Sequence, residues 1–200
     1  MCVGGGGTGG GCLTHDCKYD KLIIIVVGAV IGGICALICI CALLVRFISG
    51  RPLRANSRFI RVAAYDKLLE MENDLIFHSG TWFSKYYQYR KWHGPHRLTL
   101  NFDPTQMTVS GTGCDDVGTF KITGLYSTKT QRLGLTKTYK SGTGNLKENL
   151  GHTVTIQLHW NPRNKQFEGK WYVQTRKYRG ENVFELKLSN KQQSSIYLKV

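Results

Sequence analysis

Residues Thr153–Trp160 read TVTIQLHW, a stretch in which polar and apolar side chains alternate at every position. Val154, Ile156, Leu158 and Trp160 all fall on one parity of this alternation. Successive side chains of a β-strand point to opposite faces of the sheet. The stretch therefore predicts a strand with one buried face and one solvent-exposed face. It also indicates that the domain around it is all-β.

The same alternation recurs throughout residues 80–200, and turn residues such as Asp103-Pro104 and Asn161-Pro162 separate several of the segments. Many short strands joined by hairpins predict an eight-stranded antiparallel up-and-down barrel, with a β-sandwich as the alternative. We expect Trp82, Phe120, Trp160 and Trp171 in its core. The predicted strands are 81–91, 97–103, 106–110, 118–126, 131–140, 152–161, 166–175 and 182–188.

A glycine-rich stretch, Ser110–Gly124, reads SGTGCDDVGTFKITG. It resembles the S-G-x-G-x-D-D-V-G-x-F-x-I-x-G signature of a poorly characterised family of small β-barrel domains, and the Gly80–Trp82 start is similar to that of lipocalins and avidins. The resemblance covers about 80–190 and implies a lipocalin/avidin-like barrel, but it brings no established activity. The signature loop contains Gly111, Gly113, Asp115, Asp116 and Gly118.

Asp115 and Asp116 are the paired carboxylates of this loop. Neighbouring residues in an extended chain point to opposite faces, so the pair does not suit one substrate atom. A turn at 111–116, closed by hydrogen bonds to an aspartate side chain, is favoured instead. His93 and His96 flank Gly94-Pro95, which predicts a turn there and no metal site. We therefore expect no catalytic residue, no metal and no cofactor.

A second decisive stretch is Leu22–Ile48, which reads LIIIVVGAVIGGICALICICALLVRFI and carries one charge, Arg46. As a helix it would extend about 40 Å, more than the roughly 30 Å thickness of a bilayer core. We expect one transmembrane helix. The predicted parts of the chain are a glycine-rich flexible tail (1–21), the helix (22–48), a basic juxtamembrane linker with a short helix (49–79) and the barrel (80–200).

Arginines follow the predicted span more densely than lysines precede it. This asymmetry places the C-terminal side in the cytosol and the N-terminus outside, with the plasma membrane favoured as the location. The same charges are expected to contact anionic lipids. The predicted lipid-contact residues are Arg51, Arg54, Arg58 and Arg61.

Small residues within the span, Gly28, Gly32 and Ala36, are spaced for close helix–helix packing, which predicts a homodimer through the span. The alternative is that glycine is simply common in membrane helices. Cys39 and Cys41 are candidates for palmitoylation, with an apolar role in lipid as the alternative.

The chain has a net charge of +14, and residues 80–200 carry 19 basic and seven acidic residues, a net charge of +12. Such a domain favours anionic lipids or an acidic protein partner. Its aromatic and basic residues near Trp82 fit a barrel strand better than a nucleic-acid surface. We therefore expect a single-pass membrane protein whose cytosolic barrel is a non-catalytic binding or adaptor module. The alternatives are a lipocalin-like carrier of a small apolar ligand and an uncharacterised enzyme.

Overall fold

The computed structural model describes residues 16–61, 76–176 and 178–189, and it divides the chain into two compact units, Met1–Ile48 and Ser49–Val200. The first unit is the helix α1, Asp16–Ile48. Its segment Ile23–Val45 has a mean hydropathy of 3.1 over 23 residues, so it is long and apolar enough to cross a membrane.

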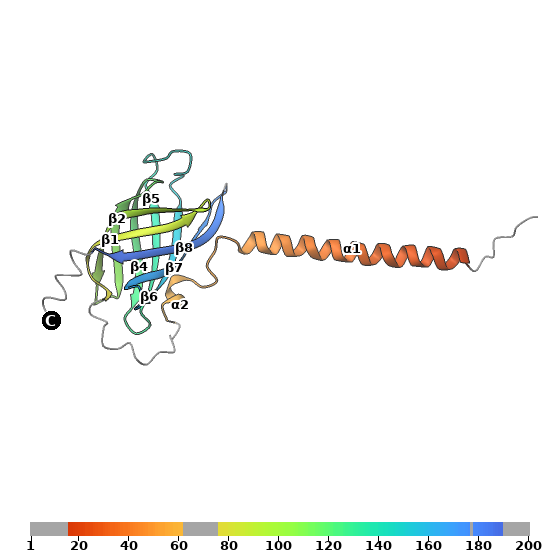
Figure 1. Ribbon diagram of the computed structural model, residues 1–200, viewed down its shortest axis with the longest axis horizontal. Coiled ribbons are helices and arrows are strands. Elements are labelled where there is room, and N and C mark those ends of the chain that lie inside the picture. The colour runs from red at the N-terminus through yellow and green to blue at the C-terminus, as the bar shows by residue number, and fades with distance from the viewer. Residues whose placement is uncertain (1–15, 62–75, 177, 190–200) are drawn as a thin grey trace, which may run out of the picture. The chain divides into compact units, whose positions relative to one another are not determined.

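The second unit is an antiparallel barrel in which every strand pairs with its neighbour in sequence and β1 pairs with β8 (Figure 1). The predicted eight-stranded up-and-down barrel is confirmed, and the sandwich alternative is excluded because the sheet closes on itself. The strands are Gly80–Gln88 (β1), Lys91–Asp103 (β2), Thr108–Cys114 (β3), Thr119–Ser127 (β4), Arg132–Tyr139 (β5), Thr153–Asn161 (β6), Gln166–Gln174 (β7) and Arg179–Leu188 (β8).

Two stretches are wrongly predicted to turn, and the predicted strand 81–91 wrongly runs past the turn at 89–90 that separates β1 from β2. The stretch 111–114 does not turn but continues β3, because its glycines lie where neighbouring chains come too close for a side chain. A Cβ on Gly111 would lie 2.3 Å from the Thr99 carbonyl oxygen, and one on Gly113 would lie 2.6 Å from the Phe120 ring. The stretch 93–96 is likewise part of β2 rather than a turn, opposite a register shift in β1.

One end of the barrel, here the closed end, is filled by side chains. It carries the loops 104–107, 128–131 and 162–165, and β1 begins there. The Phe77 ring lies 4.6 Å from that of Tyr126 and 5.4 Å from that of Phe167. Trp82 is fully buried and donates a hydrogen bond from Nε1 to the His78 carbonyl oxygen at 2.9 Å. Each aromatic pair contributes about 0.5–1.5 kcal/mol to stability beyond the burial of its area. The packed rings therefore stabilise this end of the barrel and close it.

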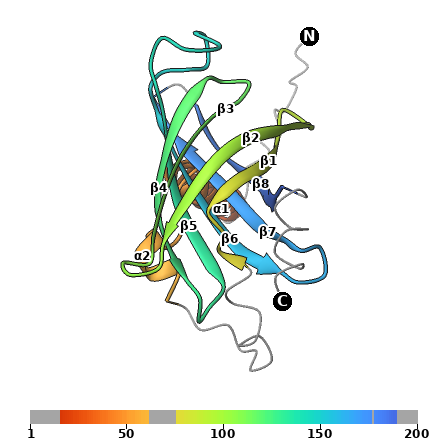
Figure 2. The ribbon, with the colours of Figure 1, turned by 90° about the vertical axis from the view of Figure 1, so that its left-hand side faces the viewer.

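The opposite end, here the mouth, carries the loops 89–90, 115–118 and 140–152 and the described residues 175, 176 and 178 between β7 and β8. The strands lean around the barrel between these two ends (Figure 2). The inward residues Val154, Ile156, Leu158, Trp171 and Val173 are buried. Phe120 is buried as well, and Trp160 is partly buried against the same core.

Residues 49–61 lie along the outside of the barrel and include the short helix α2, Asn56–Phe59 (Figure 2). The Asn56 side chain donates to the Leu135 carbonyl oxygen at 3.1 Å, and Gln157 donates to the Arg54 carbonyl oxygen at 2.7 Å. This part of the predicted linker is thus packed on β5 and β6. The short helix expected in this linker, Ala63–Asp74, lies wholly outside the described residues.

Candidate ligand-binding site at the mouth of the barrel

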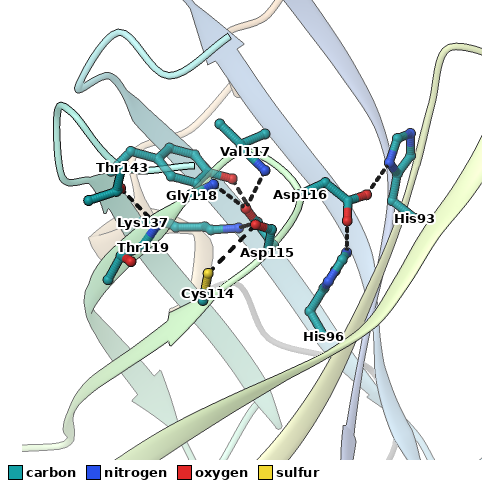
Figure 3. A network of polar contacts seen from close by, with 11 residues as sticks. His93, His96, Cys114, Asp115, Asp116, Val117, Gly118, Thr119, Lys137 and Thr143 are labelled. Atoms are coloured by element: carbon teal, nitrogen blue, oxygen red, sulfur yellow. Dashed lines mark hydrogen bonds and ion pairs between the residues drawn. The ribbon is translucent and has the colours of Figure 1, made fainter. Parts of the chain in front are cut away.

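The site begins with Asp115, which the loop between β3 and β4 turns into the barrel. Its Oδ1 accepts hydrogen bonds from the backbone N–H groups of Val117 at 3.0 Å and Gly118 at 3.2 Å (Figure 3). These bonds form the aspartate-closed turn that the sequence predicts. The Asp115 side chain is completely buried. The turn therefore presents one carboxylate oxygen, Oδ2, to the barrel interior.

Two inward residues of β5 meet that oxygen. The Lys137 ammonium forms an ion pair with Oδ2, and the Tyr139 hydroxyl donates to it at 2.8 Å. The Lys137 side chain is 5% exposed, and its ammonium lies 4.0 Å from the centre of the Phe120 ring. A buried charge needs a partner and hydrogen bonds to offset its desolvation, and Asp115 and Lys137 supply these to each other.

Burial alone would raise the pKa of Asp115. The Lys137 ammonium and hydrogen bonds from Lys137, Tyr139 and Gly118 outweigh this effect and hold the pKa below its usual value. Burial lowers the pKa of Lys137, and Asp115 opposes that shift. We take the pair as ionic at neutral pH because the carboxylate accepts four hydrogen bonds.

Burial also raises the pKa of the Tyr139 hydroxyl and of the Tyr86 hydroxyl, and the charge of Asp115 adds to both shifts. Both phenols are therefore neutral at physiological pH. They act as hydrogen-bonding groups of the barrel interior rather than as charges.

Asp116 points the other way, toward β2. Its Oδ2 lies 2.6 Å from His93 Nδ1 and its Oδ1 lies 3.8 Å from His96 Nε2 (Figure 3). The Tyr86 ring stacks on the His93 ring with their centres 4.7 Å apart. The contact of Asp116 with His93 therefore joins the loop between β3 and β4 to the pocket residue Tyr86. Burial lowers the pKa of His96, against the opposing charges of Asp116 and Asp115.

Beside Lys137, Tyr139 and Tyr86 lies a pocket of about 140 Å³ that opens at the mouth. Its walls combine aromatic rings, branched aliphatic side chains and a few polar groups. The residues that line it include Tyr86, Tyr89, Val117, Lys137, Tyr139, Leu150, His152, Val154, Ile156, Trp171, Val173, Tyr178 and Phe184.

His152 gives the pocket wall a free hydrogen-bonding atom. Its Nδ1 is buried and has no hydrogen-bond partner among the described residues, while its ring lies 4.9 Å from that of Tyr139. Burial lowers the pKa of His152, and the Lys137 charge lowers it further. A buried polar atom without a partner costs free energy, so a ligand that bonded to this nitrogen would gain affinity.

The residues of the predicted signature loop take separate roles. Gly111 and Gly113 pack inside the sheet, Asp115 pairs with the pocket residue Lys137, Asp116 contacts β2, and Gly118 donates to Asp115. Within the described residues no group of three His, Cys, Asp or Glu side chains is arranged to hold a metal ion.

The predicted lipid-contact arginines, Arg51, Arg54, Arg58 and Arg61, are exposed on the segment that packs outside the barrel, and Arg51 donates to Gln174. The residues predicted for helix association or acylation lie on α1, away from the barrel unit in sequence. There the side-chain positions of Gly28, Gly32, Ala36, Cys39 and Cys41 are exposed.

Sequence reasoning missed Lys137 and His152 as members of the site. A signal for Lys137 was present, because Leu133, Leu135, Lys137 and Tyr139 share the inward parity of β5. A lysine on the buried face of a strand needs a buried anion to offset the desolvation of its charge. The Asp115 carboxylate is that anion. His152 stands just before β6 on the inward parity of Val154 and Ile156, and the predicted strand 152–161 included it, but nothing in that pattern marked it as a pocket residue.

Comparison with known proteins gave no match to a family model, to a curated protein or to a solved structure. The resemblance of Ser110–Gly124 to a family signature stays a prediction. A function has to be inferred from the chemistry of the pocket.

Proposed function

We propose that this chain is a single-pass membrane protein whose barrel binds a small, mainly apolar ligand without catalysis. The pocket at the mouth, about 140 Å³ in volume, is the observation that carries the proposal. An apolar cavity of about 150 Å³ in a protein takes up a molecule of the size of benzene. The ligand is therefore a compact molecule with one ring or a short branched chain.

The polar groups of the pocket define what else the ligand carries. Lys137 is neutralised by Asp115 behind it, and the two other charged residues that line the pocket, Lys147 and Glu148, have opposite charges, so the pocket has no net charge to offer an ion. Tyr139 stands beside Asp115, and His152 Nδ1 is the buried atom that still needs a partner. A neutral molecule with one hydroxyl or carbonyl group, such as a simple phenol, satisfies these walls best.

The length and composition of α1 support anchorage in a membrane. The arginines after the span support an orientation with the barrel in the cytosol. The protein would then hold its ligand beside the cytosolic leaflet, as a receptor or a carrier.

The proposal is tested on the full chain reconstituted in nanodiscs, by saturation-transfer NMR with a panel of monocyclic phenols and ketones. Val154→Phe adds a ring to the pocket wall, and Thr155→Phe makes the same change one residue away on the outer parity. We expect Val154→Phe to weaken binding by about tenfold or more, a change of about 1.4 kcal/mol, and Thr155→Phe to leave it within about twofold.

Unfolding curves of both variants show whether each barrel is intact. Equal binding by folded Val154→Phe, or no binding of any panel member to the unaltered chain, contradicts the proposal.

A second candidate function is a tethered adaptor for an acidic protein, and it is favoured by a groove on the outer face of β1, β2 and β8. There the exposed Phe83 lies among three basic residues, Lys85, Arg97 and Lys187, and one acidic residue, Glu185. An acidic segment with one apolar side chain would match this surface. Proximity labelling from the C-terminus tests it: Phe83→Ala with Arg97→Gln should remove specific acidic neighbours, and an unchanged set of labelled proteins rejects it.

A further inference from the structure

Large apolar side chains are exposed around the mouth of the barrel. Tyr89 is 58% exposed, Trp92 49%, Leu146 67% and Leu150 46%, and these four residues are here called the mouth rim. Tyr89 and Leu150 also border the pocket. Among the described residues in the closed-end loops, Met107, at 39%, is the large apolar side chain exposed to a similar degree. Four of the eight large apolar side chains exposed in the described part of the barrel unit therefore lie at the mouth. Of the others, Leu53, at 94%, lies on the segment before α2, and Phe83 and Val183 lie on the outer faces of β1 and β8.

Basic side chains accompany the mouth rim. Arg90 and Lys91 lie between Tyr89 and Trp92, and Lys147 follows Leu146. Acidic side chains exposed in the described mouth loops are fewer, namely Asp116 and Glu148. The exposed basic residues of these loops and of the strand ends next to them are Arg90, Lys91, Lys140, Lys147, Arg176 and Arg179.

The chain enters the barrel unit beside this same end. Gly50 is buried with a φ of +75°, and a Cβ there would lie 2.2 Å from the Val173 carbonyl oxygen. Val173 lines the pocket, as does Tyr178, whose ring lies 6.1 Å from that of Tyr89. Gly50 follows Val45, the last residue of the apolar segment, by five positions. Whatever angle the two units take, five residues span at most about 18 Å.

From these observations we propose that the mouth rim docks on the headgroup region of an anionic bilayer. Tryptophan and tyrosine favour the membrane–water interface, and leucine adds apolar burial there. Arginine and lysine beside them are attracted to anionic lipids. The pocket then opens against the membrane, and its ligand enters from the lipid phase rather than from bulk water.

Trp92 reports docking directly, since the other three tryptophans, Trp82, Trp160 and Trp171, lie in or against the barrel core. The full chain is reconstituted in nanodiscs that contain lipids brominated near the headgroup, with or without phosphatidylserine, and tryptophan quenching is measured. We expect strong quenching in anionic discs and its loss in Trp92→Phe.

Removing two rim charges tests the electrostatic part. Arg90→Gln with Lys147→Gln should lower the ratio of docked to undocked barrel by roughly thirtyfold. The matched control at the closed end, Lys129→Gln with Arg163→Gln, should leave quenching unchanged. Near-UV circular dichroism confirms that each variant is folded.

Quenching that is equal in unaltered chain and Trp92→Phe, or equal in the two charge variants, overturns the proposal. The proposal rests on α1 spanning the bilayer, and failure of that premise is recognised separately because the chain would not float with the discs. No ligand is present in this measurement, so its result is independent of what the pocket binds.

Discussion

The buried pair of Asp115 and Lys137 makes the sharpest prediction about stability. Asp115→Asn keeps the shape of the side chain and an oxygen for the N–H groups of Val117 and Gly118. It removes the negative charge facing a lysine whose side chain is 5% exposed. Breaking a buried ion pair from one side costs about 3–5 kcal/mol, so we expect a loss of that size.

Lys137→Met leaves the opposite charge buried. The Asp115 carboxylate then keeps Tyr139 and two backbone N–H groups as donors. The loss in the free energy of unfolding should therefore be about 3 kcal/mol. The double variant leaves no charge uncompensated and should cost about 1–2 kcal/mol. The coupling free energy between the two positions is therefore about 4–7 kcal/mol.

Denaturant unfolding of the full chain in mild detergent, followed by tryptophan fluorescence, measures the four free energies of the cycle. The matched control is the exposed pair of Lys170 and Glu181, 3.2 Å apart with side chains 54% and 36% exposed. Its cycle, Lys170→Met with Glu181→Gln, should give a coupling below about 1 kcal/mol. Equal coupling in the two cycles would refute the assignment of Asp115 and Lys137 as a buried ion pair.

Four further predictions follow from the structure. The pKa of Asp115 in the folded chain lies below its unfolded value of about 3.9. The stability that Asp115 contributes at neutral pH is therefore lost as the pH falls through the folded pKa. Below about pH 4, the free energy of unfolding of Asp115→Asn should depend less on pH than that of the unaltered chain. Gly111→Ala should cost about 1–3 kcal/mol or more in thermal unfolding, because its Cβ would meet the Thr99 carbonyl oxygen at 2.3 Å. Gly28→Ile should weaken self-association of the span in a membrane reporter assay, and unchanged association would leave Gly28 as an ordinary membrane glycine. A tag after Val200 should resist external protease on intact cells, and its digestion would reverse the predicted orientation.

The barrel could be predicted because its strands repeat one pattern. The alternation through Val154, Ile156 and Leu158 fixes which face is dry, and all three side chains are buried. The predicted end of β3 was wrong, because Gly111 and Gly113 are typical turn residues and the strand was predicted to stop before them, at residue 110, whereas β3 continues to Cys114. The small size of the two glycines serves close strand packing instead, and that need comes from Thr99 and Phe120, which are not their neighbours in sequence.

Less of the site than of the barrel could be predicted from the sequence. The opposite directions of Asp115 and Asp116 follow from the geometry of extended chain, and they are observed. Their partners, Lys137 and His93, lie about twenty residues away on other strands. Local periodicity cannot pair a loop with a particular strand position. The packing of 49–61 on the barrel was missed for the same reason, because Asn56 and Gln157 meet only through tertiary contact.

A crystal structure of the full chain soaked with 4-iodophenol tests the ligand-binding account most directly, since the iodine is located by its anomalous scattering. If the pocket binds simple phenols, an iodine peak lies inside the mouth of the barrel, in contact with Trp171 and Tyr139 and beside Lys137. The account also predicts the loss of that peak in Val154→Phe. Iodine found only outside the barrel, or a mouth filled by side chains as the closed end is, would contradict the account.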